Sequence, residues 1–168
     1  MMSAQKVIEE YLNDLGIGSY RRLAKIVYKQ QQGYIVGLTQ DDCLQAVLDV
    51  MANREMQHAM LVAIELDSIA QEAANHDGGV ARQANPLIRL LVKDDSNFGV
   101  DERIAMSVAG LYGSIATSNF GYLDKVKPGV IGEINDMGKN GARVTTMIDD
   151  MLCAVVACAE ADLAGGGL

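Results

Sequence analysis

The sequence predicts an all-α, single-domain protein, and three observations indicate this class. The chain has 168 residues, a length that suits one domain with a sizeable core. Hydrophobic residues make up 49% of it but aromatic residues only 5%, so Ala, Leu, Met and Val supply most of the apolar mass. Apolar residues recur at helical spacing along the chain, and only residues 33–39 resemble a strand. We therefore expect a bundle of about seven to nine helices.

Polar caps and helix breakers set the boundaries of these helices. Thr39 followed by Asp42 forms a variant of the capping box, and Asn85 before Pro86 is a strong helix start. The other expected N-caps are Ser3, Ser19, Asn53 and one of Thr145 and Thr146. The expected helices span residues 4–15, 20–31, 40–52, 54–75, 86–93, 100–117, 130–138 and 147–163.

The Ala/Gly-rich helix over residues 100–117 is expected to lie at the centre of the bundle. Its small residues recur at spacings of three and four near one face: Ala105, Ala109, Gly113 and Ala116. Such a face lets neighbouring helices approach closely. This packing would offset the cost of about 1 kcal/mol that each interior glycine adds to helix formation. Residues 118–129 and 139–145 are expected to be irregular.

Charge and apolar patterning exclude several classes of protein. The net charge of −8 repels nucleic acid and anionic lipid head groups, so neither is expected as an electrostatic partner. No apolar run approaches the roughly 18 residues of a transmembrane segment, and the N-terminus lacks a signal pattern, so we expect a cytoplasmic protein. Cys43, Cys153 and Cys158 have neither zinc nor redox spacing and are expected to be buried thiols. The high apolar content is compatible with a homo-oligomer.

Acidic residues interrupt the apolar C-terminal half at three places. Asp101–Glu102 and Asp149–Asp150 open two predicted helices, and Asp124 lies between them. Negative charge is favourable in a first helical turn. Adjacent helical residues point about 100° apart, however, so at least one aspartate of the last pair must face protein. A buried carboxylate needs a partner, and several carboxylates with few cations are typical of a hard divalent ion such as Mg²⁺.

These acidic segments resemble the phosphatidylglycerophosphatase A family. The blocks "VDERIAMSVAGLYGS", "FGYLDKVKPG" and "MIDDMLCAVVA" occur in the family's order, within about residues 98–160. The block "NREMQHAMLVAIELD" is similar to the soluble Gram-positive branch, the low-temperature-requirement C proteins. The better-known members are integral membrane proteins with long apolar helices, and Val100 stands where they tend to carry Trp. This chain departs from them in both respects, so we expect a cytoplasmic protein, with a peripheral place at the membrane as the alternative.

The resemblance implies a Mg²⁺-dependent phosphatase that removes the terminal phosphate of phosphatidylglycerophosphate. The substrate would be a phosphate ester, with a phospholipid head group as the candidate. The implied metal ligands are Asp101, Glu102, Asp124, Asp149 and Asp150. The implied catalytic residues are Asp124, Asp149 and Lys127, and the candidate phosphate contacts are Lys125, Lys127 and Arg143. Metal-activated water is the favoured nucleophile, and Asp124 is the alternative. Because Lys127 precedes Pro128, its backbone is expected to be extended.

Three other interpretations compete with a phosphatase. Glu55 and His58 form an ExxH pair, but a di-iron bundle needs a second such pair and further glutamates. His76–Asp77 is a histidine-aspartate dipeptide, yet two histidines are too few for a phosphohydrolase of that type. The third interpretation is a non-catalytic helical regulatory or binding module that keeps the family fold, with the acidic pairs as helix caps or a structural ion site.

Overall fold

The computed structural model describes residues 3–75 and 85–165, and within these ranges it contains nine helices and no strand. The predicted all-α class and the number of helices are therefore confirmed. Residues 33–39 form turns and not a strand, while His76 and Asp77 lie outside the described residues. The helices are α1 (Ala4–Asp14), α2 (Arg21–Gln31), α3 (Gln40–Ala52), α4 (Arg54–Asn75), α6 (Pro86–Lys93), α7 (Val100–Gly110), α8 (Ser114–Val126), α9 (Val130–Lys139) and α10 (Ile148–Ala164).

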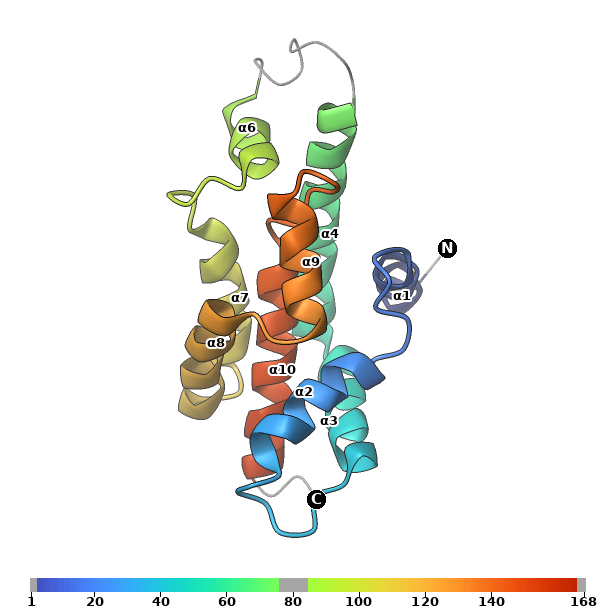
Figure 1. Ribbon diagram of the computed structural model, residues 1–168, viewed down its shortest axis with the longest axis vertical. Helices are drawn as coiled ribbons and strands as arrows, with labels where there is room; N and C mark the ends of the chain where they lie inside the picture. The colour runs from blue at the N-terminus through green and yellow to red at the C-terminus, as the bar shows by residue number, and fades with distance from the viewer. Residues whose placement is uncertain (1–2, 76–84, 166–168) are drawn as a thin grey trace.

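The last helix, α10, lies at the centre of the fold. It contacts α2, α3, α4, α7, α8 and α9, which surround it (Figure 1). Of its 17 residues, 15 are buried, including both aspartates of its first turn. A helix that is apolar on every side has no face that water solvates well, so it is stable only when neighbouring helices cover it.

The segment expected to be a single central helix is instead two helices beside α10. Gly113 has a φ of 91°, a conformation that a side chain rarely adopts, and it separates α7 from α8. The small residues Ala105, Ala109 and Ala116 are fully buried, as a close-packing face requires. They are divided between two helices, and the segment expected to be irregular continues α8 as far as Val126.

Most of the predicted helix starts are confirmed by hydrogen bonds. Thr39 and Asp42 form the capping box, with Thr39 Oγ1 accepting from Asp42 N at 3.1 Å and Asp42 Oδ2 accepting from Thr39 N at 2.8 Å. The side chains of Ser3, Asn53 and Asn85 accept backbone N–H groups at the starts of α1, α4 and α6. Ser19 does not cap α2, which begins after Tyr20 without a side-chain cap.

Burial agrees with the expectations for the thiols. Cys43, Cys153 and Cys158 are all buried and unpaired.

As for the membrane, no described helix combines the length and the apolarity that crossing a bilayer demands.

Candidate active site

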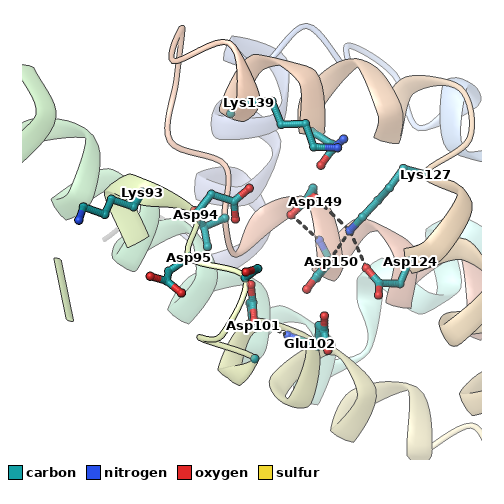
Figure 2. Close-up of a pocket in the computed structure, with 15 residues that line it drawn as sticks. Lys93, Asp94, Asp95, Asp101, Glu102, Asp124, Lys127, Lys139, Asp149 and Asp150 are labelled. Atoms are coloured by element: carbon teal, nitrogen blue, oxygen red, sulfur yellow. Dashed lines mark hydrogen bonds and ion pairs between the residues drawn. The ribbon is translucent and has the colours of Figure 1, made fainter. Parts of the chain in front are cut away.

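One cavity of about 480 Å³ brings all five predicted acidic residues together. The first turn of α7 contributes Asp101 and Glu102, and the last turns of α8 contribute Asp124. Asp149 and Asp150 enter from the first turn of α10 (Figure 2). Segments almost 50 residues apart in the chain thus meet because α7 and α8 both pack on α10.

The ammonium group of Lys127 lies among three of these carboxylates. Its Nζ is 2.8 Å from Asp124 Oδ1 and 3.0 Å from Asp149 Oδ2, and it also contacts Asp150 Oδ1 (Figure 2). The carboxylate side chains differ in exposure, with 26% for Asp124, 10% for Asp149 and 5% for Asp150. Lys127 is therefore the direct partner of the two buried aspartates.

The backbone of Lys127 is not extended, contrary to the prediction from the following proline. Its φ of 46° and ψ of 62° place it in the left-handed region, where it forms the C-cap of α8. Its N–H donates to Leu123 O at 2.7 Å. This hydrogen bond, which ends the helix, outweighs the preference for an extended backbone that Pro128 imposes on the residue before it. This conformation costs a residue with a side chain about 1–2 kcal/mol. The three ion pairs hold the lysine there and direct its ammonium group into the acidic cavity.

A buried aspartate of α4 fixes the start of α10. Asp67 is fully buried, and its carboxylate oxygens accept from Met147 N at 3.1 and 3.2 Å and from Ile148 N at 2.9 Å. It takes the capping place expected of Thr145 or Thr146, which have other partners. Thr145 Oγ1 donates to Ile134 O at 3.1 Å, and Thr146 Oγ1 donates to Leu91 O at 2.7 Å.

Burial and like charges favour the protonated carboxylic acids in this region. Burial raises the pKa of Asp149 and Asp150, the neighbouring Asp149 charge raises that of Asp150 further, and Lys127 opposes both effects. Burial also raises the pKa of Asp101, and it raises that of Asp67 to about 8 despite the backbone donors. For Lys127, burial favours the neutral amine, but Asp149 and Asp150 outweigh it and raise the pKa. The site therefore stabilises a positive charge among its carboxylates.

Two of the predicted phosphate contacts do not line this cavity. Lys125 is exposed on α8, and the lining residues do not include it. Arg143 pairs with Asp14 Oδ2 at 2.8 Å, and its guanidinium group lies 5.4 Å from the ring centroid of Tyr11. Arg143 thereby ties the loop before α10 to α1, while Lys127 is the only one of the three candidates in the cavity.

Other charged residues that line the cavity were missed by the sequence reasoning. Asp94 and Asp95 follow α6, Lys93 ends that helix, and Lys139 ends α9 (Figure 2). The "KDDSN" stretch is acidic and follows an apolar helix, so the logic applied to the other acidic pairs could have found it. Glu55 and Asp67, which the sequence offers as weaker candidates to line the site from the long helix, do not line the cavity.

The residues of the cavity fit a divalent metal ion in kind. Carboxylate oxygens are the ligands that Mg²⁺ prefers, and two of these carboxylates, Asp149 and Asp150, are buried. Among the residues that the structure describes, no three His, Cys, Asp or Glu side chains are already arranged as a metal site. Between Asp124, Asp149 and Asp150 lies the ammonium group of Lys127. The donor atoms thus suit Mg²⁺ in their chemistry, but Lys127 is the partner of these three carboxylates in this arrangement. The metal role of these residues stays a prediction.

This chain belongs to the phosphatidylglycerophosphatase A family, whose sequence model matches residues 43–164. The matched region contains every acidic residue of the predicted site and Lys127.

Relatives from two bacterial species share most of the chain. The uncharacterized protein YutG of Bacillus subtilis (strain 168) is 39% identical over 142 residues, which cover 84% of this chain and 80% of YutG. The uncharacterized protein YpjQ of the same strain is 34% identical over 158 residues, covering 94% of this chain and 82% of YpjQ. The crystal structure of the low temperature requirement C protein from Listeria monocytogenes matches with a TM-score of 0.84 and 34% identity, covering 99% of this chain and 98% of that one. The resemblance stated from the sequence blocks is thus confirmed at the level of the family.

Proposed function

We propose that this protein is a Mg²⁺-dependent phosphatase that hydrolyses a phosphomonoester, with a phosphatidylglycerophosphate-like lipid as substrate. The observation that supports it best is the charge of the cavity, where seven carboxylates and three lysines are found among the described lining residues. A phosphomonoester is itself an anion, so it would be repelled unless a cation neutralised part of this charge. The family to which the chain belongs supports the phosphate ester and the lipid.

The ligands in this proposal are the carboxylates of Asp101, Glu102, Asp124, Asp149 and Asp150. Bound Mg²⁺ would neutralise charge on the phosphoryl oxygens and make a bound water more acidic. Asp67 holds the first turn of α10 through Met147 N and Ile148 N, so it orients the last acidic pair.

The remaining residues bind phosphate and move a proton in this proposal. Lys127 Nζ supplies a point charge for the phosphate, since Lys127 is the one of the three contacts predicted from the sequence that lines the cavity. Asp124 is the most exposed of the three carboxylates on Lys127, so it is the best placed to accept a proton from the attacking water. Asp124 as the nucleophile itself stays the alternative, which would leave a phosphorylated aspartate detectable by mass spectrometry.

The test is phosphate release from phosphatidylglycerophosphate in detergent micelles, with Mg²⁺ or with EDTA. We expect release that requires Mg²⁺ and falls at least about 100-fold in Asp149→Asn, because that change removes one charged ligand without altering shape. Asp136→Asn is the matched control, since Asp136 is exposed on α9 and does not line the cavity. Activity that survives in Asp149→Asn would show that the site is wrong. Activity confined to water-soluble phosphates would remove the lipid assignment.

A non-catalytic regulatory or binding module is the second candidate, and the position of Lys127 favours it. Its ammonium group already compensates two buried aspartates, as a purely structural ion-pair cluster would require. Under this alternative, the protein releases no phosphate from any phosphomonoester, with or without Mg²⁺.

A further inference from the structure

Positive charge is concentrated on α2, although the protein carries a net charge of −8. This helix contains Arg21, Arg22, Lys25 and Lys29 and no acidic residue. Each of its arginines has a carboxylate partner, Asp41 for Arg21 at 3.2 Å and Glu133 for Arg22 at 2.7 Å. The two lysines are exposed, and within the described part of the chain neither forms an ion pair. Their charge is thus available to an external anion.

Exposed apolar side chains lie beside these lysines. Tyr34 is 84% exposed and Val36 is fully exposed in the turn between α2 and α3, and Ile115 and Tyr122 are exposed on α8. The turn and the first half of α8 flank the end of α2 in the lower part of Figure 1. Large apolar side chains this exposed are unfavourable in water, and a cluster of them indicates a contact surface.

Two shallow cavities join these side chains, apart from Val36, into one surface, and Val36 lies two residues after Tyr34 in the adjoining turn. A cavity of about 410 Å³ is lined by Lys25, Lys29 and Tyr122, among others. A cavity of about 520 Å³ is lined by Lys29, Tyr34, Ile115 and Tyr122, among others. Because both share Lys29 and Tyr122, the surface is continuous. We call it the α2–α8 face and define it by Lys25, Lys29, Tyr34, Val36, Ile115 and Tyr122.

The α2–α8 face adjoins the acidic cavity through one short segment. Pro128 and Gly129 line the 410 Å³ cavity, while the preceding residue, Lys127, lines the acidic one. The helix α2 and the turn after it lie before residue 43, where the match to the family begins. A basic helix therefore lies next to the segment that carries Lys127.

We propose that the α2–α8 face docks this protein on the surface of an anionic phospholipid bilayer. The lysines attract anionic head groups within about 8 Å at physiological salt, and tyrosines and valine insert among the head groups. The choice of a bilayer over another polyanion rests on the proposed function, since a lipid phosphatase must reach a membrane. The exposed apolar residues favour it as well, because a nucleic-acid backbone offers them no apolar phase. The global net charge does not oppose docking, since screening limits repulsion from distant acidic residues.

The test is co-sedimentation with vesicles of phosphatidylglycerol and phosphatidylcholine, compared with vesicles of phosphatidylcholine alone. We expect binding to the anionic vesicles only, weakened by salt. The double variant Lys25→Glu/Lys29→Glu is expected to bind at least about 10-fold more weakly. The double variant Tyr34→Ser/Val36→Ser, which alters only exposed side chains, is expected to bind the anionic vesicles severalfold more weakly. The matched control is Lys6→Glu/Arg89→Glu, which makes the same charge change at exposed sites on α1 and α6.

The outcomes separate docking from catalysis. Absence of binding by the wild type, equal binding by the lysine variant, or an equal loss in the control would overturn the docking proposal. Binding of RNA with the same dependence on Lys25 and Lys29, but no binding of vesicles, would overturn it too. Phosphate release in detergent micelles is measured on the same variants and does not depend on docking. Vesicle binding without any phosphate release would therefore support the docking surface and remove the proposed activity.

Discussion

Replacing Lys127 with methionine removes the cation between Asp124, Asp149 and Asp150 while keeping most of the apolar stem. We expect the variant to fold with a lower free energy of unfolding and with a new dependence on pH. Two of the three carboxylates are nearly inaccessible to water, so they must either remain charged without a partner or take up protons.

The loss in free energy of unfolding is set by whichever of these two outcomes has the lower free-energy cost. An unpaired buried charge costs about 3–5 kcal/mol. Keeping one aspartate protonated at pH 7, against its ordinary pKa of 3.8, costs about 4 kcal/mol, because each pKa unit corresponds to about 1.4 kcal/mol. At pH 5.5 protonation costs only about 2 kcal/mol. The variant should therefore be less stable than the wild type by about 3–4 kcal/mol at pH 7 and by about 2 kcal/mol at pH 5.5.

The direction of the pH dependence is fixed by the sign of the pKa shift. A carboxylate whose pKa is raised on folding contributes most to stability below its unfolded pKa, and this contribution is lost as the pH rises. The difference in free energy of unfolding between the wild type and Lys127→Met should thus grow from pH 5 to pH 8. Mg²⁺ at about 100 times its dissociation constant should restore about 2.7 kcal/mol in the variant, since the ion replaces the missing positive charge.

The assay is urea denaturation followed by circular dichroism at pH 5.5, 7 and 8, with and without Mg²⁺. Lys93→Met is the matched control, because Lys93 lines the same cavity but is exposed. It should change the free energy of unfolding by less than about 0.5 kcal/mol. An equal loss in both variants, or a loss in Lys127→Met that neither pH nor Mg²⁺ alters, would refute this reasoning.

Three further predictions concern residues that do not line the acidic cavity. Asp67→Ala should lower the free energy of unfolding by about 2–4 kcal/mol in urea denaturation, because it leaves two buried N–H groups without acceptors, and Asp67→Asn should lower it less. Gly132→Ala should cost about 1–3 kcal/mol and reduce phosphate release, because a Cβ there would lie 2.5 Å from Lys127 O; retention of both properties would contradict the packing. Thr39→Ala should cost about 1 kcal/mol through loss of the capping box, with phosphate release unchanged in the same assay.

Local sequence patterns predicted the helices well where a cap or a breaker marks them. The capping box at Thr39 and the start at Asn85–Pro86 depend on neighbours within three residues, so they can be read from the sequence. The central helix could not be identified in this way. Because α10 is apolar all round, it has little periodicity, whereas the small residues before Gly113 suggested a single long helix.

The acidic members of the site could be predicted because burying a carboxylate without a partner costs several kcal/mol, roughly, in free energy of folding. This cost and the family blocks together point to Asp101, Asp124 and the last acidic pair. They could not identify Lys127 as their immediate partner, since Lys127 is 22 and 23 residues from the last pair and adopts a conformation that Pro128 disfavours. Asp67 lies about 80 residues from the amides it caps, and only tertiary packing brings it there.

The measurement that tests the central claim most directly is binding of Mn²⁺, a paramagnetic substitute for Mg²⁺, followed by electron paramagnetic resonance. We expect saturable binding to the wild type, competition by Mg²⁺, and affinity at least about 10-fold weaker in Asp149→Asn but unchanged in Asp136→Asn. Absence of saturable binding, or equal affinity in Asp149→Asn, would contradict this claim and leave the carboxylates as partners of Lys127 alone.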